Sequence, residues 1–221
     1  MAAFPEDIFT EPTNIDPDTL ANLGPLTRLA GVWQGDKSLD INPKADGPEH
    51  RVFHEHIELQ PIDPQTNGPQ LFYGLRYHIH ITADGEEFAF HDQVGYWLWE
   101  PATGLILQTV TIPRGQAIMA GGKAKPGDKT LHLEATRGST EDGISECGFL
   151  EYAFRTDSYT IDVTFNDDGT WSYQLTTMLT VKGEAAPFKH QDRNTLHKLA
   201  EPTPNDAMAR KVAGSKPKPQ P

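Results

Sequence analysis

The feature that most constrains this chain is a repeated two-residue alternation of apolar and polar side chains. Over residues 158–165 every odd-numbered residue is apolar or aromatic and every even-numbered one is polar, which is typical of a strand with one buried face. Asp167-Asp168-Gly169 then supplies a tight turn, because glycine tolerates the positive φ that hairpins need. The alternation resumes over 171–181. These two segments therefore predict a complete β-hairpin.

Ten segments carry strand signals, and no helix-period segment of useful length interrupts them. They are residues 31–39, 51–59, 71–81, 88–100, 105–112, 116–124, 130–136, 158–165, 171–181 and 189–199. Short turns between successive strands predict antiparallel neighbours, and closing such a meander into a barrel removes its exposed edges. Ten strands leave room inside for a ligand. We therefore predict an all-β fold, a ten-stranded antiparallel up-and-down β-barrel with an internal cavity. A β-sandwich is the alternative.

The two ends of the chain differ from this central region. Residues 1–25 hold five acidic side chains and no basic one. They predict an arm with one short helix, in which Asp16 is the N-cap and Gly24 the end. Residues 200–221 end in Lys-Pro-Lys-Pro-Gln-Pro and predict a flexible, basic, proline-rich tail. The barrel domain is expected over 26–199. Long loops at its rim are expected over 40–50, 61–69 and 137–148, and 149–154 fits either a helical turn or a strand.

Charge and composition exclude several classes of protein. The net charge is −12, and a surface this acidic repels nucleic-acid phosphates and anionic lipid. No run approaches the roughly 20 consecutive apolar residues of a membrane helix, and the N-terminus lacks the basic and apolar regions of a signal peptide. Cys147 is the only cysteine, so it forms no internal disulfide. We therefore expect a cytoplasmic protein whose partners are neither nucleic acids nor membranes.

Histidine is the residue type with the widest chemical range here, because it binds metals and haem and transfers protons near neutral pH. His54 and His56 are predicted to point outward from their strand, where solvation is the simpler role. His78 and His80 share the outer face of another strand, and a His-x-His pair with an acid can bind a metal. His91 precedes an aromatic strand from which it can reach the cavity. An enzyme built on His78 and His80, or on His91, is one hypothesis, although the common hydrolase, kinase and zincin motifs are missing from the sequence.

The strongest signal joins the first and last predicted strands. The first reads Leu26-x-x-Leu29-x-Gly31-x-Trp33-x-Gly35, and His190 opens the last, which would close the barrel against the first. Gly-x-Trp-x-Gly combined with a terminal-strand histidine and ten strands resembles the nitrobindin-like haem-binding β-barrels. This family was once described as fatty-acid-binding-protein-like and is related to the calycins. The resemblance covers about residues 26–199.

The resemblance implies a specific function. Such barrels bind haem b near the open end, with the iron held by one histidine of the final strand, here His190. Nitric oxide binds to the ferrous form, and isomerisation of peroxynitrite to nitrate is attributed to the ferric form, which would make the protein an enzyme. The sequence itself assigns no catalytic residue. Trp33 is more typical of a plug in the barrel floor than of a ligand contact. The further candidate haem-binding residues are Trp33, Gly35, Tyr77, His91 and Phe188.

Alternatives stay open beside this reading. The sequence departs from the family pattern at Lys37, where glycine is usual, and it is unusually polar directly after His190. A haem-free carrier of a fatty acid or another small hydrophobic ligand is therefore the alternative function. His197 is the other histidine of the last strand, but its odd spacing from His190 places it on the opposite face. Arg114 and Arg137 lie in turns where either can meet a carboxylate of the ligand. The oligomeric state stays open, with a homodimer as one option.

Overall fold

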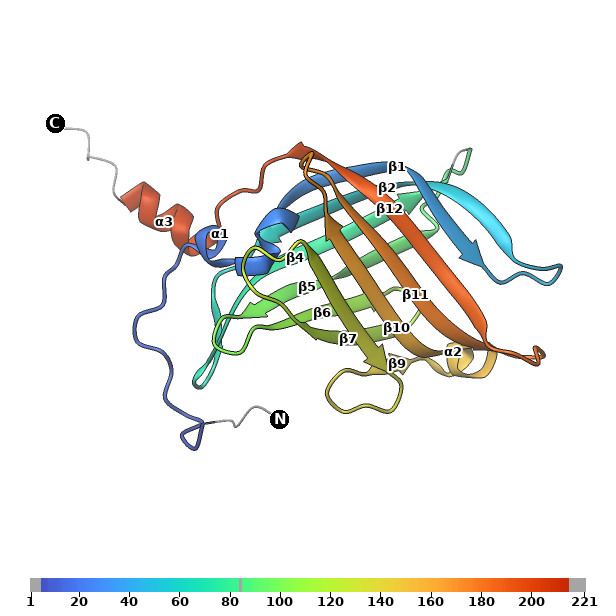
Figure 1. Cartoon of the computed structure of the whole chain (residues 1–221), viewed down its shortest axis with the longest axis horizontal. Coiled ribbons are helices and arrows are strands. Elements are labelled where there is room, and N and C mark those ends of the chain that lie inside the picture. Colours follow the sequence, from blue (N-terminus) through green and yellow to red (C-terminus); the bar gives the residue numbers. More distant parts are fainter. Residues whose placement is uncertain (1–4, 84, 215–221) are drawn as a thin grey trace.

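The computed structural model describes residues 5–83 and 85–214, with the backbone alone for Lys37 and Ser38. Its body is a closed antiparallel β-barrel of ten long strands (Figure 1). They are β1 (Gly31–Asn42), β2 (Glu49–Pro61), β4 (Gln70–Thr82), β5 (His91–Glu100), β6 (Leu105–Ile112), β7 (Gln116–Lys123), β8 (Thr130–Thr136), β10 (Phe154–Phe165), β11 (Trp171–Val181) and β12 (Phe188–Ala200). Each long strand pairs with the next long strand along the chain, and the pairing of β1 with β12 closes the ring. The predicted up-and-down barrel is confirmed, and the sandwich is excluded.

The largest departure from the predicted strands lies between β1 and β2. Both strands continue past their expected ends, pairing Asp40 with Arg51 and Asn42 with Glu49. The expected loop over 40–50 is reduced to residues 43–48, because backbone pairing continues where the side chains no longer alternate. The expected loop over 61–69 similarly contains a short strand, β3 (Gln65–Asn67), which pairs with β4.

One part of the barrel wall is thinly hydrogen-bonded. Among the described residues, β7 and β8 share a single paired position, Gly121 with Glu134. The other half of β7 pairs with a short strand, β9 (Ile144–Glu146). A short helix, α2 (Gly148–Ala153), follows and leads directly into β10, which resolves the open choice for residues 149–154. In Figure 1, β9 and α2 lie at the end of the barrel away from the N-terminal helices. This segment completes the wall beside one mouth of the barrel.

The other mouth is closed by the N-terminal segment, which forms α1 (Thr19–Asn22) and the 3-10 helix η1 (Gly24–Leu29). Leu23, Leu26 and Leu29 are fully buried in the barrel core. The Trp33 indole Nε1 donates a 2.8 Å hydrogen bond to the Leu29 carbonyl, and its ring packs edge-on against Trp171. Trp33 therefore fills the barrel floor, the role that its residue type favours.

The expected start of the N-terminal helix is wrong by two residues. Asp18, not Asp16, caps α1, and its side chain accepts a 3.2 Å hydrogen bond from the backbone N–H of Ala21. Asp16 instead accepts a 3.0 Å hydrogen bond from the Asp18 N–H and shapes the turn before the helix. Gly24 follows the end of α1 as expected, at a φ of 54°. A Cβ at this position would also lie 2.5 Å from the Trp99 ring.

The C-terminal region contains a helix that the sequence does not predict, α3 (Asp206–Gly214). Asn205, just before it, is buried. Its Nδ2 donates hydrogen bonds to the Pro17 carbonyl at 2.9 Å and to Asp63 Oδ1 at 2.7 Å. The expected flexible tail is thus attached to the N-terminal arm in its first part, while residues 215–221 lie outside the described chain. Of the described helices, none is long and apolar enough to cross a membrane.

Candidate functional site

A cavity of about 520 Å³ lies inside the barrel, and side chains of α2 contribute to its wall. Most of the lining is apolar, and residues from most of the long strands take part in it. A cavity of this size with a few convergent polar groups is typical of a small-molecule site. The polar lining includes two histidines, three acids and two arginines: His91, His190, Asp40, Glu55, Asp192, Arg51 and Arg114.

His190 faces the cavity from β12, opposite Thr177 of β11. Its Nδ1 lies 3.0 Å from Thr177 Oγ1, and its Nε2 lies 2.9 Å from Asp40 Oδ1 and 3.7 Å from Asp192 Oδ2. Asp192 follows two residues later in the same strand and so shares this face. The ligand atoms of the two acids and the imidazole all lie within 4.8 Å of one another, so this cluster can also hold a metal ion directly.

Asp40 reaches the cluster because of an irregularity in β1. The register between β1 and β2 shifts by one residue between Gly35 and Ser38, which is the signature of a β-bulge. An extra residue reverses the inward and outward alternation of everything after it. Asp40 therefore faces inward where unbroken alternation would place Leu39, and it lies directly opposite Asp192 in β12.

The charges in this cluster follow from burial and contacts. Burial acts to lower the pKa of His190, but the hydrogen bond to Asp40 and the surrounding carboxyl groups outweigh it, so this pKa is raised. Burial raises the pKa of Asp192 to about 8. Burial also acts to raise the pKa of Asp40, but hydrogen bonds from His190 and Asn42 outweigh it and lower this pKa. These directions favour a His190 imidazolium paired with the Asp40 carboxylate, while Asp192 holds its proton more tightly than an ordinary aspartic acid.

Glu55 is a second buried acid on the cavity wall. Its Oε2 accepts hydrogen bonds from Asn194 Nδ2 at 2.7 Å and from the Tyr173 hydroxyl at 2.9 Å. Burial raises the pKa of Glu55 to about 7, so it exchanges a proton near physiological pH. The sequence signal for Glu55 is its place between Phe53 and Ile57, the apolar residues that share its face of β2.

His91, at the start of β5, ends a chain of hydrogen bonds along the wall. Its Nε2 lies 3.2 Å from Gln93 Oε1. Gln93 Nε2 donates to the Tyr77 hydroxyl at 2.7 Å, and that hydroxyl donates to the Thr109 carbonyl at 2.8 Å. Burial lowers the pKa of His91 and raises the pKa of Tyr77, so both side chains are neutral at neutral pH. The cavity thus contains a neutral imidazole whose orientation is fixed.

The remaining candidate haem-binding residues lie away from the cavity wall as far as the described residues define it. Trp33 and Gly35 are buried toward the closed end, and Phe188 begins β12 outside the lining. Close packing accounts for the glycine at position 35, because a Cβ there would lie 2.1 Å from Nδ2 of Asn194. His197 is exposed on the outer face of β12, as its odd spacing from His190 predicts.

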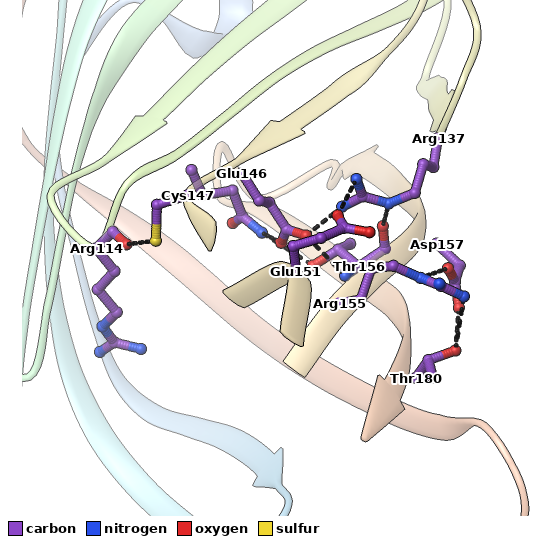
Figure 2. Close-up of polar contacts among 10 residues, drawn as sticks. Arg114, Arg137, Glu146, Cys147, Glu151, Arg155, Thr156, Asp157 and Thr180 are labelled. Atoms are coloured by element: carbon purple, nitrogen blue, oxygen red, sulfur yellow. Dashed lines mark hydrogen bonds and ion pairs between the residues drawn. The ribbon is translucent and has the colours of Figure 1, made fainter. Parts of the chain in front are cut away.

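A network centred on Glu146 of β9 fixes the segment beside the mouth (Figure 2). The Glu146 carboxylate accepts a 3.0 Å hydrogen bond from the Thr156 N–H and forms an ion pair with Arg137. Arg137 also pairs with Glu151 of α2 at 2.8 Å. These contacts attach α2 to the barrel, which keeps its side chains against the cavity. Arg137 is therefore a structural residue of this segment.

Arg114 is the other arginine that the sequence singles out, and it does line the cavity. In Figure 2 its guanidinium points away from the Glu146 network, while its backbone carbonyl accepts a 3.5 Å hydrogen bond from Cys147 Sγ. The guanidinium donates to the Phe90 carbonyl. Arg51 lies over the Phe90 ring, 4.3 Å from its centroid. Two guanidinium groups thus flank Phe90 on the cavity wall.

The residues present fit haem in three respects. The wall is largely apolar. The Thr177 hydroxyl can accept a hydrogen bond from Nδ1–H of His190, which leaves Nε2 as the atom that donates to iron. The guanidinium groups of Arg51 and Arg114 suit the propionate carboxylates. Two contacts oppose binding. Asp40 holds Nε2 at 2.9 Å, and the Arg51 guanidinium is already paired with Glu86. Iron ligation therefore requires that His190 leave Asp40.

Comparisons with known proteins agree with the fold. Residues 22–198 match the model of the family described as the THAP4-like, heme-binding β-barrel domain. The crystal structure of Rv2717c from M. tuberculosis is similar, with a TM-score of 0.57 and 18% sequence identity over 84% of this chain and 99% of that chain. At this identity the similarity shows the fold alone. No curated protein matches the sequence. Because the family match spans most of its length, the chain belongs to the THAP4-like heme-binding β-barrel domain family.

Proposed function

We propose that this protein binds haem b in the barrel cavity and that Nε2 of His190 is the iron ligand. The observation that carries the assignment is the position of His190 on the cavity wall, with Thr177 Oγ1 3.0 Å from its Nδ1. Such a contact fixes the orientation and tautomer of a metal-binding imidazole. Membership of a heme-binding family supports haem as the cofactor.

The chain's other cavity residues have roles that suit a small ligand. Haem held there would supply an iron able to bind a diatomic or peroxynitrite-type ligand, and the proposed activities are nitric oxide binding and isomerisation of peroxynitrite to nitrate. His91, oriented by Gln93, offers a neutral imidazole to such a ligand. The guanidinium groups of Arg51 and Arg114 would pair with carboxylates of the bound ligand. The apolar lining limits access of water.

Hemin titration tests the iron ligand. Wild-type protein and His197→Ala are expected to give a Soret band with equal affinity, because His197 lies on the outer face of the same strand. His190→Ala is expected to lose the band or bind hemin much more weakly. A band of unchanged intensity and affinity in His190→Ala would remove His190 as the ligand.

Rapid mixing tests the activities separately. Ferrous protein is mixed with nitric oxide and ferric protein with peroxynitrite, and the nitrate yield is measured. Peroxynitrite decay no faster with wild type than with His190→Ala would exclude the isomerase while leaving haem binding intact.

A haem-free carrier of a fatty acid is the second candidate, and two observations favour it. Arg51 and Arg114 offer a carboxylate site in an apolar cavity, and the iron-binding atom of His190 is engaged by Asp40. Native mass spectrometry of the purified protein separates the candidates. Co-purified fatty acid without haem supports the carrier, and haem without lipid opposes it.

A further inference from the structure

A cluster of histidines on the outside of the barrel has no part in the cavity site. In β4 the side chains of Tyr77 and Ile79 face inward, and His78 and His80 between them face outward. Asp92 of β5 lies directly opposite His80 in the antiparallel pair. The side chains of His78, His80 and Asp92 are 51%, 48% and 42% exposed. All three are therefore open to ions from solvent.

The two imidazoles converge on one carboxylate oxygen. Nε2 of His78 lies 2.9 Å from Asp92 Oδ2, and Nδ1 of His80 lies 3.6 Å from the same atom. The three ligand atoms all lie within 4.8 Å of one another. A tetrahedral zinc ion with bonds of about 2.05 Å places its ligands about 3.3 Å apart. The two nitrogen–oxygen distances fall on either side of this value, so side-chain rotations that bring the two imidazole nitrogens to the same spacing would complete the site.

The donor types select among metals. Two imidazole nitrogens and one carboxylate oxygen form the ligand set of many zinc sites that keep a fourth position for water. Calcium and magnesium prefer oxygen ligands alone. His56 of β2 lies opposite His80 on its other side, so a further imidazole shares this face. The net charge of −12 also favours cations near the surface.

We propose that His78, His80 and Asp92 form a zinc-binding site on the outer wall of the barrel, with a fourth position open to water. The site is separate from the cavity, because its residues point to the other side of β4 and β5. It therefore does not depend on haem binding, and the two sites can be filled together.

A second histidine cluster on the outer wall provides a matched control. His132 of β8 lies 2.7 Å from Asp162 and 4.0 Å from Glu134, and its side chain is also exposed. This cluster has one imidazole in place of two. His132→Ala should therefore leave zinc affinity unchanged.

Calorimetric titration with Zn²⁺, on protein without a histidine tag and at a pH where imidazole is neutral, tests the proposal. Wild type and His132→Ala are expected to bind Zn²⁺ at this site with equal affinity, with or without hemin. His78→Ala and His80→Ala should weaken binding by more than the roughly 10- to 100-fold that loss of an outer-shell partner costs.

Circular dichroism checks that each variant is folded, as expected for exposed positions. Equal affinity in wild type, His78→Ala and His80→Ala would overturn the proposal, as would the absence of Zn²⁺ binding in wild type. Loss of binding in His190→Ala alone would assign the metal to the cavity cluster instead. Failure of the haem proposal would leave this result unaffected.

Discussion

Haem can reach Nε2 of His190 only after the contact with Asp40 is broken, which makes Asp40→Ala a direct probe of the proposed site. Nε2 lies 2.9 Å from Asp40 Oδ1, and the two groups form a charged pair in the cavity. Removing the carboxylate lowers the pKa of His190 and frees the lone pair that iron needs. Asp40→Ala is therefore expected to tighten hemin binding, although it removes a native contact.

The magnitude follows from the contact that is lost. A hydrogen bond to a charged group contributes about 1.5–3 kcal/mol net, and about 1.4 kcal/mol is worth a factor of ten in affinity. Full release of this contact corresponds to about 10- to 100-fold tighter binding. Asp192 lies 3.7 Å from the same nitrogen and can partly replace Asp40. We therefore expect the lower end of the range, about tenfold.

Soret titration of wild type, Asp40→Asn and Asp40→Ala measures this effect. Asp40→Asn keeps an acceptor without the charge and should fall between the other two. Asp162→Ala is the control, because it removes the carboxylate of another Asp–His pair, 2.7 Å from His132 on the outer wall. Equal or weaker hemin binding by Asp40→Ala than by wild type would refute the reasoning, since iron ligation would then not compete with Asp40.

Three further outcomes follow from the same structure. Hemin affinity should rise with pH through the raised pKa of His190, because the protonated imidazole has no free lone pair, and Asp40→Ala should move this rise to lower pH in Soret titrations across pH. Glu55 binds its proton more tightly when folded, with a pKa of about 7 against 4.5, so folding stability is lost as pH rises from 4.5 to 7. Glu55→Gln should therefore lose about 2.5 kcal/mol less stability than wild type between pH 5 and pH 8 in urea unfolding, and an unchanged pH dependence would contradict the assignment. Gly35→Ala should lower the free energy of unfolding by about 1–3 kcal/mol in the same assay, because its Cβ would collide with Asn194. A stability equal to that of wild type would show that Asn194 moves aside without cost.

The barrel itself can be predicted from the sequence because its strands have one buried face. In β8 exposed and buried positions alternate without exception over Thr130–Thr136, and the predicted bounds are the observed ones. The signal fails near the mouth, where the ends of β1 and β2 have little core to face. There the backbone pairs while the side chains show no period, so residues 40–42 and 49–50 appear as loop in the sequence.

The site is only partly visible in the sequence for a related reason. His190, His91 and Tyr77 follow regular alternation and lie on the cavity wall. Asp40 does not, because the bulge between Gly35 and Ser38 reverses its face, and a bulge in one strand is defined by its partner's register. Asp92 joins His78 and His80 only through the pairing of β4 with β5, which spacing along one strand cannot reveal.

The positions of the charged side chains in the cavity allow an experiment to distinguish haem from a fatty acid as the ligand. The carboxylate of a fatty acid is expected to bind Arg51 and Arg114, which leaves the Asp40–His190 pair intact, whereas haem needs both the arginines and a free His190. Asp40→Ala should therefore tighten hemin binding and leave the affinity for a fluorescent fatty acid unchanged. Arg51→Ala should lower the affinity for both ligands, because each presents a carboxylate. If Asp40→Ala increased the affinity for both ligands equally, Asp40 would act through the net charge of the cavity. The result would then no longer support His190 as the iron ligand.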